Sequence, residues 1–352
     1  MRVCVATTVH HPEDARILHR QIRALLDAGH EVTYVAPFTH CNVTPAPPIT
    51  PIDVPRAAGL GRSLRAARTA LRRASGDSDL LLLHDLGLLL ALPFRHPPVV
   101  LDLPAPSTDP LGRILESRAL CHHHVIRRHA TGAATHAVVP DGTLVSGAPV
   151  APGQGRVVHL GRLTAQHGVN ELIDLAQRLV PYGVRLDLLG EADAEARTLL
   201  RDAQRVGLLD WYGYVPHRHA VRMAEGALAG LSLGHPGGLG PPAKILDYMG
   251  RGLPVVTTPG GAGLVEEAGC GVVVPYGDVD AALRAVLDLK NDPVRRAALG
   301  GRGHAEARLS HHWPDHAPRF VALLEGWAAA PEGRGQRGRR PEYVVRDAPG
   351  RS

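Results

Sequence analysis

The segment GRLTAQHG, residues 161–168, has the composition of a phosphate-binding loop. It follows an apolar strand pattern over residues 156–160 and leads into a helix that begins near Gly168. Free backbone N–H groups at a helix N-terminus attract anions. The guanidinium of Arg162 can donate two parallel hydrogen bonds to phosphate oxygens. The segment therefore predicts a diphosphate site at Arg162.

A second segment with chemical potential is PPAKILDYMGRGLPVVTTPGGAG, residues 241–263. Lys244 and Asp247 stand three residues apart, which places them on one face of a helix. Residues 252–254 (GLP) then turn into a buried strand. A carboxylate near a helix start beside a cleft can accept hydrogen bonds from both hydroxyls of a ribose. An ordinary ion pair on a solvated helix face is the alternative.

Histidines follow two strands of the first half. His84 and Asp85 come directly after the apolar run 80–83, and His10 and His11 lie in the turn after the first strand. Loops at strand ends often carry function, so we expect these side chains near a cleft. A helix-capping role for His84, and chance placement of His10 and His11 among 21 histidines, are the alternatives.

Other familiar signatures are absent from the sequence or out of place. The turn after the first strand reads TTVHHPEDARI instead of the GxGxxG of dinucleotide-binding domains, and no Walker A sequence occurs. The triplet DSD at 77–79 precedes its strand, so we interpret it as a loop. In CHHH, residues 121–124, adjacent side chains point in different directions, which disfavours a metal site. The sequence predicts no bound metal and no cofactor.

Strand and helix patterns alternate along most of the chain. The predicted strands are 2–8, 31–37, 80–83, 98–103, 156–160, 184–189, 228–233, 254–257 and 271–274. The predicted helices are 13–28, 63–74, 168–180, 194–206, 242–250, 280–289, 293–307 and 313–329, and residues 44–55 are predicted as a loop. Repeated strand–helix units with continuous apolar strands favour parallel sheets covered on both faces. The expected fold class is α/β, with two Rossmann-like domains facing a central cleft.

The domain boundaries follow from changes in composition. Residues 1–141 form the predicted N-terminal domain, and 142–155, rich in Gly, Ala and Pro, the linker. Residues 156–310 form the predicted C-terminal domain. A final helix over 311–330 is expected to cross back to the first domain. The tail 331–352, with arginines among Gly and Pro, is expected to be disordered.

Composition limits the class of protein. The chain has 352 residues, 44% hydrophobic and 21% charged, which is typical of a globular protein. Aromatic residues make up only 4%, which disfavours polynucleotide readers that stack bases on aromatic side chains. The four scattered cysteines fit a reducing cytoplasm. No signal-peptide pattern and no membrane-length apolar run is found, so we expect a cytoplasmic location.

One predicted helix leaves open a contact with membranes. Arg65, Arg68 and Arg72 share one of its faces, and Leu64 and Leu71 lie on another. Such a helix suits an anionic lipid surface or a lipid-phosphate acceptor. A solvated arginine face is the alternative.

In combination, these segments resemble the retaining, nucleotide-sugar-dependent family-four glycosyltransferases of the GT-B fold. The turn HHPEDARI resembles one branch of that family. The resemblance covers most of residues 1–103 and 156–327, and its stretches are TTVHHPEDARILHRQIRALLDAGHEVTYVAP, LLLHDLGLLLALP, VVHLGRLTAQHG, DWYGYVP, KILDYMGRGLPVVTTP, EEAGCGVVVPYGD and HHWPDHAPRFVALL.

The resemblance assigns roles in the phosphate-binding region residue by residue. Arg162, next to Gly161, matches the arginine that contacts the donor diphosphate. His167 stands where the family usually has a second, lysine cation, and Lys244 matches a lysine that can supply that cation. The first glutamate of the Glu-x7-Glu pattern, which touches the donor sugar, falls on Leu239.

The remaining donor-site positions follow in the same way. Asp247 falls on the second glutamate, which holds the ribose. Tyr214 and Val215 match backbone positions that frame the nucleobase. His84, with Asp85, matches a histidine whose imidazole faces the donor sugar.

The first domain departs from the family in length. Only about forty residues separate Asp102 from Asp141, where the family has a longer stretch with an additional strand–helix unit. This half normally shapes the acceptor site, so the resemblance implies an abbreviated acceptor pocket, with His10 and His11 on the acceptor side.

The resemblance implies transfer of a hexose from a nucleotide diphosphate sugar to a hydroxyl acceptor, with retention and without metal. The acceptor is a glycan, a lipid-linked intermediate or a small aglycone. One alternative is a non-catalytic or degenerate nucleotide-sugar-binding homologue, favoured by Leu239 and His167. The other is a nucleotide-sugar epimerase of the same fold, which would need carboxylates in the cleft.

Overall fold

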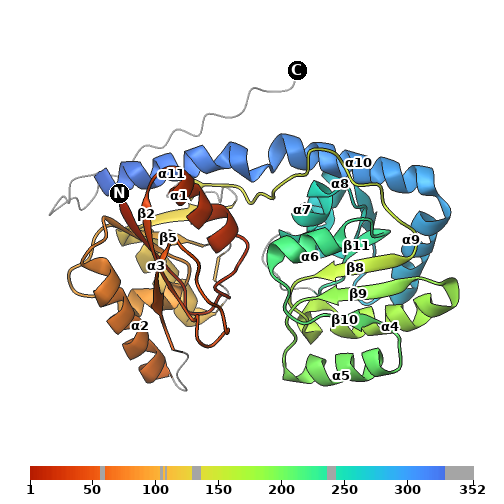
Figure 1. Cartoon of the computed structure of the whole chain (residues 1–352), viewed down its shortest axis with the longest axis horizontal. Coiled ribbons are helices and arrows are strands. Elements are labelled where there is room, and N and C mark those ends of the chain that lie inside the picture. The colour runs from red at the N-terminus through yellow and green to blue at the C-terminus, as the bar shows by residue number, and fades with distance from the viewer. Residues whose placement is uncertain (56–59, 104–105, 108, 129–135, 236–242, 330–352) are drawn as a thin grey trace. The chain divides into compact units, whose positions relative to one another are not determined.

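The computed structural model describes residues 1–55, 60–103, 106–107, 109–128, 136–235 and 243–329 (Figure 1). The chain divides into two compact units. Unit 1 consists of Met1–Pro140 and His316–Ser352, and unit 2 of Asp141–Asp315. The predicted tail 331–352 and Leu239 lie outside the described residues.

Unit 1 is built on a parallel sheet with the strand order β3-β2-β1-β4-β5-β6-β7. Because the strand order reverses between β1 and β4, the loops that follow these two strands lie at a topological switch point, where open α/β sheets bind ligands. These loops contain the candidate histidines. The strands are β1 Arg2–Ala6, β2 Glu31–Ala36, β3 Thr50–Asp53, β4 Leu80–Leu83, β5 Val99–Asp102, β6 His124–Arg127 and β7 Ala137–Val138.

The helices of unit 1 are a π-helical segment η1 Ile17–Ile22, α1 Arg23–Asp27, α2 Leu60–Ser75, the 3-10 segment η2 Leu86–Ala91, and α3 Pro110–His122. Helix α11, Trp313–Ala329, belongs to unit 1 from His316 onward. There, Glu325 lies 3.0 Å from the Nε2 of His30, and the Trp327 ring stacks on His124 with centroids 4.6 Å apart.

Three parts of unit 1 differ from the sequence prediction. Helical structure begins at Ile17 instead of residue 13, because the carboxylate of Asp14 accepts the backbone N–H groups of Arg16 and Ile17. The predicted loop 44–55 contains strand β3. The stretch after Asp102 contains α3, β6 and β7, and Asp109 caps α3 by accepting the N–H of Gly112 at 2.7 Å.

Unit 2 contains a second parallel sheet, with the order β10-β9-β8-β11-β12-β13 and a switch point between β8 and β11. The strands are β8 Arg156–Leu160, β9 Arg185–Leu189, β10 Asp210–Trp211, β11 Ala229–Ser232, β12 Val255–Thr257 and β13 Gly271–Val273. The helices are η3 Ala165–His167, α4 Val169–Leu179, η4 Val180–Tyr182, α5 Ala194–Arg205, α6 His217–Ala224, α7 Ala243–Gly250, η5 Pro259–Gly261, α8 Ala262–Glu267, α9 Val279–Asn291 and α10 Pro293–Ser310.

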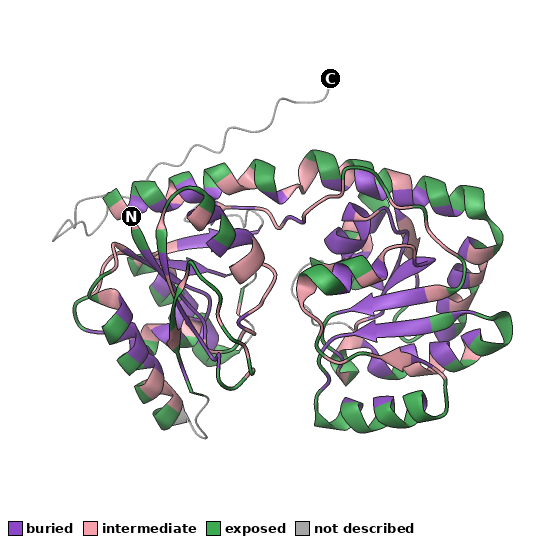
Figure 2. Ribbon diagram, in the orientation of Figure 1, coloured by how far each residue is buried: buried purple, intermediate pink, exposed green. Residues whose placement is uncertain are grey.

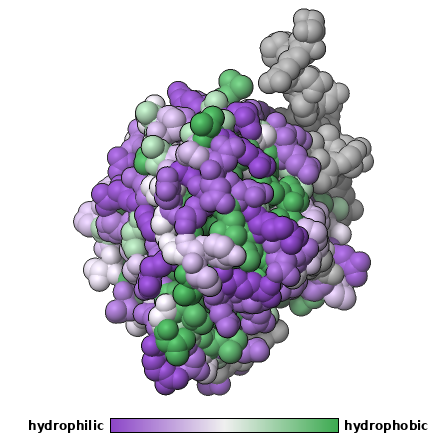
Figure 3. Space-filling model, turned by 90° about the vertical axis from the view of Figure 1, so that its right-hand side faces the viewer, coloured by the Kyte–Doolittle hydropathy of each residue, from purple (hydrophilic) through white to green (hydrophobic). Residues whose placement is uncertain are grey.

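Two hydrophobic clusters cover the faces of this sheet, because alternate strand residues point to opposite sides. Val157 packs in the cluster that includes side chains of α4, α5 and α9. Val158 packs in the one that includes α6, α7 and α8. Figure 2 shows the buried strands between helices whose outer faces are exposed. On the face of unit 2 drawn in Figure 3, hydrophobic side chains form separate small groups among hydrophilic ones.

The segment 142–155, predicted as a linker, is hydrogen-bonded to the rest of unit 2. Thr143 exchanges backbone hydrogen bonds with His311 and Trp313. Val150 donates its N–H to Arg251, and Gly153 to Gly226. These bonds satisfy backbone groups along the segment.

The amphipathic helix α2 uses its leucines for the core of unit 1. Leu71 is fully buried and Leu64 packs against the same cluster, while Arg65, Arg68 and Arg72 are exposed. The apolar face is therefore already covered by protein. Among the described residues, no helix combines the length and the hydrophobicity of a membrane span.

Tyr248 ties β8 to β11 at the core of unit 2. Its ring lies against Gly230, where an added Cβ would come within 2.3 Å of the ring. Its hydroxyl accepts the backbone N–H of Leu160 at 2.8 Å and donates to the carbonyl of Leu231 at 3.1 Å.

We expect Tyr248→Phe to lower the free energy of unfolding by about 1–3 kcal/mol, because the buried N–H of Leu160 loses its acceptor. Chemical denaturation of the full chain followed by circular dichroism measures this. Tyr182→Phe, at a side chain that is 47% exposed, is the control and should change little. Equal unfolding midpoints for the wild type and Tyr248→Phe would contradict the prediction.

Candidate active site

Glycines shape the loop after β8 in unit 2. Gly161 has φ +104° and Gly168 has φ +80°, both in the region that favours glycine. An added Cβ on Gly190, which follows β9, would lie 1.8 Å from the carbonyl oxygen of Gly161. The backbone of two neighbouring loops therefore meets at the carboxyl end of the sheet, where a side chain would keep them apart.

Basic side chains gather at this loop. The Nζ of Lys244, at the start of α7, would lie 3.6 Å from a Cβ placed on Gly161. Arg162 is exposed and forms no ion pair within the described residues. The Nδ1 of His167 lies 2.7 Å from the hydroxyl of Thr164, which also caps η3 by accepting the N–H of His167. The structure thus brings the predicted Arg162, His167 and Lys244 together.

Burial and mutual repulsion act on these cations. Burial lowers the pKa of Lys244 to about 7. Burial, and then the charges of Lys244 and Arg162, lower the pKa of His167. The sequence analysis missed His159, whose Nε2 lies 2.9 Å from the Nζ of Lys244. The sequence feature that could have identified His159 is its place as a lone imidazole in the largely apolar strand RVVHL.

The sequence predicts that the carboxylate of Asp247 lies beside a cleft, where it could accept hydrogen bonds from a ribose. The structure gives this carboxylate other partners. Its side chain is buried, and both oxygens have partners. The hydroxyl of Thr143 donates to Oδ1 at 2.7 Å, and the Nε2 of His217 lies 2.9 Å from Oδ2. The alternative interpretation was an ion pair between Lys244 and Asp247 on a helix face, and these two side chains do not form one. Thr143 and His217 were not predicted, because they are 104 and 30 residues away in the chain.

The loop after β10 carries Tyr214 and Val215. Tyr214 is 37% exposed, and Val215 packs against the cluster that contains α7. Gly190 donates its N–H to the carbonyl of Gly213 at 2.8 Å. The loops after β8, β9 and β10 are thus linked side by side, with Gly190 between the other two.

Asp85 organises the switch point of unit 1. Its carboxylate accepts the backbone N–H of Thr8 at 2.5 Å and lies 3.2 Å from the Nδ1 of His10. The hydroxyls of Thr7 and Thr8 donate to it as well. Burial alone would raise the pKa of Asp85, but His10 and the Thr8 N–H lower it. The carboxylate therefore fastens the β1 loop to the β4 loop.

His84 belongs to a buried network. Its side chain has no exposed surface, and its Nδ1 lies 3.4 Å from Asp102 at the end of β5. Arg128 and Gln21 donate to the same carboxylate at 2.7 and 2.6 Å. Burial lowers the pKa of His84, so the ring is neutral at pH 7. A direct contact of His84 with a sugar would require this ring to become exposed, whereas His10 and His11 are already partly exposed.

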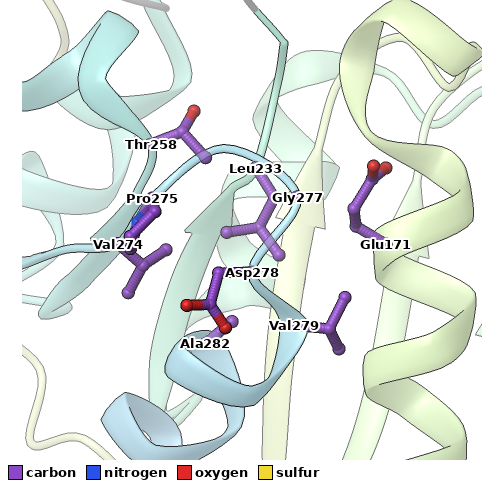
Figure 4. Close-up of a pocket in the computed structure, with 9 residues that line it drawn as sticks. All are labelled: Glu171, Leu233, Thr258, Val274, Pro275, Gly277, Asp278, Val279 and Ala282. Carbon is purple, nitrogen blue, oxygen red and sulfur yellow. The ribbon is translucent and has the colours of Figure 1, made fainter.

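A small hollow and the acidic and histidine side chains elsewhere offer no second site among the described residues. In Figure 4, Leu233, Thr258 and Val274, which follow β11, β12 and β13, line a hollow beside Glu171. Its volume of about 10 Å³ holds one water molecule and no sugar. Among the described residues, no group of three or more His, Cys, Asp or Glu side chains is placed to hold a metal ion. In the DSD triplet, Asp79 accepts the backbone N–H of Arg2.

Known proteins resemble this chain in sequence and in structure. Residues 154–292 match the family described as glycosyl transferases group 1. A stretch of 81 residues is 33% identical to the GDP-mannose-dependent monoacylated alpha-(1-6)-phosphatidylinositol monomannoside mannosyltransferase of Corynebacterium glutamicum. That stretch is 23% of this chain and spans only 21% of the relative.

Solved structures are similar over nearly the whole chain. Sucrose-phosphate synthase from Thermosynechococcus elongatus has a TM-score of 0.73 at 19% identity, covering 94% of this chain and 99% of that one. Anabaena HepE in complex with UDP-glucose has a TM-score of 0.70 at 16% identity, covering 93% and 100%. The fold is GT-B. The group 1 match, which contains the loop at Arg162 and the pair Lys244–Asp247, supports a GT-B glycosyltransferase.

We expect Asp85→Asn to destabilise the protein by about 1–3 kcal/mol at pH 7, because an amide cannot accept from all of these donors. The folded-state pKa of Asp85 is below its unfolded value, so its stabilisation is present above about pH 4 and is lost as the pH falls further. Denaturant unfolding at pH 7 and at pH 3.5 should show the gap between wild type and variant shrinking in acid.

Asp77→Asn, at a side chain that is 93% exposed, is the matched control. A gap that stayed constant with pH would show that Asp85 is not the titrating group.

Proposed function

We propose that this protein is a family-four-like GT-B glycosyltransferase that moves a hexose from a nucleotide diphosphate sugar to a hydroxyl acceptor, with retention and without a metal ion. The observation that supports it most is the cluster of Arg162, His167 and Lys244 on a glycine-shaped loop before helix α4. This cluster lies within the segment that matches group 1 glycosyl transferases.

The chemistry needs charge stabilisation on the leaving group. When the bond between the sugar and the diphosphate breaks, negative charge builds up on the departing phosphate oxygen. A guanidinium and an ammonium fixed beside that oxygen stabilise this charge without reorganising solvent. Arg162 takes the first role, and Lys244, with His167, assists. The departing oxygen takes the proton of the acceptor hydroxyl in a front-face reaction, so we assign no protein base.

The nucleoside lies at the neighbouring loops in this proposal. The backbone at Tyr214 and Val215 frames the base, and Asp247 serves the ribose. Because Thr143 and His217 already bind its oxygens, Asp247 either exchanges one of these partners for ribose or acts through His217. In unit 1, we assign His10 and His11 to the acceptor side.

Two donors deserve the first tests. HepE was solved with UDP-glucose, and the Corynebacterium relative is described as GDP-mannose-dependent. Binding to the folded state raises apparent stability by RT ln(1 + [L]/Kd). A thermal-shift series with uridine, guanosine, adenosine and thymidine diphosphate sugars therefore identifies the donor before the acceptor is known.

The competing functions give different products. A non-catalytic binder would show a thermal shift without release of nucleoside diphosphate. An epimerase would convert one nucleotide sugar into another without releasing the nucleotide. Release of nucleoside diphosphate by hydrolysis or transfer supports the proposed transferase. The absence of a shift with every donor would refute the donor site.

We expect Arg162→Ala to lower kcat/KM by about 10²–10³-fold, comparable with the loss of one oxyanion donor. Arg162→Lys should recover only part of this, because an ammonium cannot reproduce the bidentate geometry. The assay is turnover of the donor found by thermal shift. Arg201→Ala, at an exposed arginine of α5, is the control. Wild-type turnover by Arg162→Ala would place the diphosphate elsewhere.

We expect Asp247→Asn to weaken nucleotide binding by about 1–3 kcal/mol, because an amide accepts fewer hydrogen bonds than a carboxylate. Calorimetry with the cognate nucleotide diphosphate measures the loss. His217→Ala separates the two roles of Asp247. It weakens binding to a similar extent if Asp247 acts through His217, and leaves binding intact if the carboxylate contacts ribose directly. Unchanged affinity in Asp247→Asn would remove this residue from the site.

A further inference from the structure

His159 is an unusual residue for its position. It lies near the end of β8, between Val158 and Leu160, and has no exposed surface. Its Nε2 lies 2.9 Å from the Nζ of Lys244. A hydrogen bond between two basic nitrogens needs a lone pair on one of them, so both groups cannot be charged in this arrangement.

The environment of the pair determines which of the two side chains, His159 or Lys244, binds the proton. Burial and the charge of Lys244 hold the pKa of His159 well below its usual range, so the imidazole is neutral. Lys244 is therefore the group of the pair that titrates near neutral pH, and burial brings its pKa to about 7. A lysine that is fully charged in water is thus only partly charged here.

Among the described residues, the other charged or titratable groups that act near the pair lie on the loop after β8 and at the start of α5. His167 lowers the pKa of His159 further, and Arg162, on the same loop, lowers the pKa of His167. Asp193 acts on His167, but its carboxylate also caps α5 by accepting the N–H of Ala196 at 2.8 Å. The neighbouring segment 236–242 (PGGLGPP) has no titratable side chain.

We propose that binding of a nucleotide diphosphate sugar at this loop is coupled to the uptake of one proton by the His159–Lys244 pair. The proton comes from the solvent and converts the Lys244 amine into an ammonium, while the Nε2 of His159 accepts one of its N–H groups. The two negative charges of the diphosphate supply the attraction that the free protein lacks. His159 is a positioning residue, because it acts on the ligand through Lys244.

This inference rests on the proposed function, which supplies its ligand. The pH dependence of donor affinity then has a defined sign. Above about pH 7, binding must protonate Lys244, so affinity falls by up to tenfold for each pH unit. Below that pH the proton is already present, and the dependence on Lys244 disappears. A donor sugar esterifies the terminal phosphate, so the ligand itself does not titrate in this range.

Calorimetry of the full chain with UDP-glucose and with GDP-mannose measures the coupling. At pH 8, titrations in HEPES and in Tris, which differ in ionisation enthalpy, give the number of protons taken up. We expect a value near one at pH 8 that falls toward zero at pH 6. Lys244→Arg keeps a permanent charge, so it should bind without uptake. His159→Gln keeps an acceptor and should retain the uptake, whereas His159→Leu should lose it.

A second measurement needs no ligand. Lys244 and Lys290 are the only lysines, so protein labelled with ¹³C-lysine gives two sets of signals. Lys290→Arg, at a half-buried residue at the C-terminal end of α9, assigns them. We expect the Cε signal of Lys244 to titrate with a midpoint near 7. A midpoint above 9 would overturn the proposal.

The two measurements separate the possible failures. If the donors bind without proton uptake while Lys244 titrates near 7, the coupling is refuted and the proposed function stands. If neither donor nor any other nucleotide sugar binds, the proposed function fails, and the coupling fails with it.

Discussion

The candidate site depends on one constraint. Among the described residues, the carboxylates near its basic side chains already have other partners. Arg162, His167 and Lys244 gather at one loop, and the acidic side chains close to them are already bound. Asp193 caps α5, and Asp247 accepts from Thr143 and faces His217. After burial, the charges of Lys244 and Arg162 lower the pKa of His167, and Asp193 offsets only part of this effect. An anion that carries two or more charges would relieve this repulsion, which is the basis of the diphosphate site that we propose.

Backbone geometry keeps these charges together. If Gly190 had a side chain, it would collide with the carbonyl of Gly161, and a side chain on Gly168 would come within 2.1 Å of the carbonyl of Leu233. The loops can therefore approach closely enough for Lys244, from a different helix, to reach the loop after β8. Tyr248, one helical turn further along α7, is fixed by hydrogen bonds to β8 and β11. The position of Lys244 is thus determined by the sheet through the helix that carries it.

Sequence patterns predicted the long, continuous elements and missed those that depend on distant partners. The apolar runs of β4 and β8 and helix α11 were found to the residue, and α2, predicted over 63–74, spans Leu60–Ser75. Strands β7 and β10 have two residues each, too few for any periodicity. In the site, Arg162 and His167 could be predicted because one loop motif contains them, and Lys244 because the helix motif KILDYM contains it. His159, His217 and Asp102 could not, because their roles depend on contacts between residues far apart in the chain.

The buried carboxylates of the two units, Asp102 and Asp247, have different partners, and this difference affects the chemistry that each can perform. In unit 1, Asp102 is paired with Arg128 and hydrogen-bonded to Gln21, and burial keeps His84 beside it neutral. In unit 2, Asp247 accepts from the hydroxyl of Thr143 and faces the imidazole of His217. A glutamate here, one methylene longer, would have to displace His217 from its position 2.9 Å away. The shorter aspartate and His217 therefore belong together as one arrangement, in which the imidazole occupies space that a longer carboxylate would need.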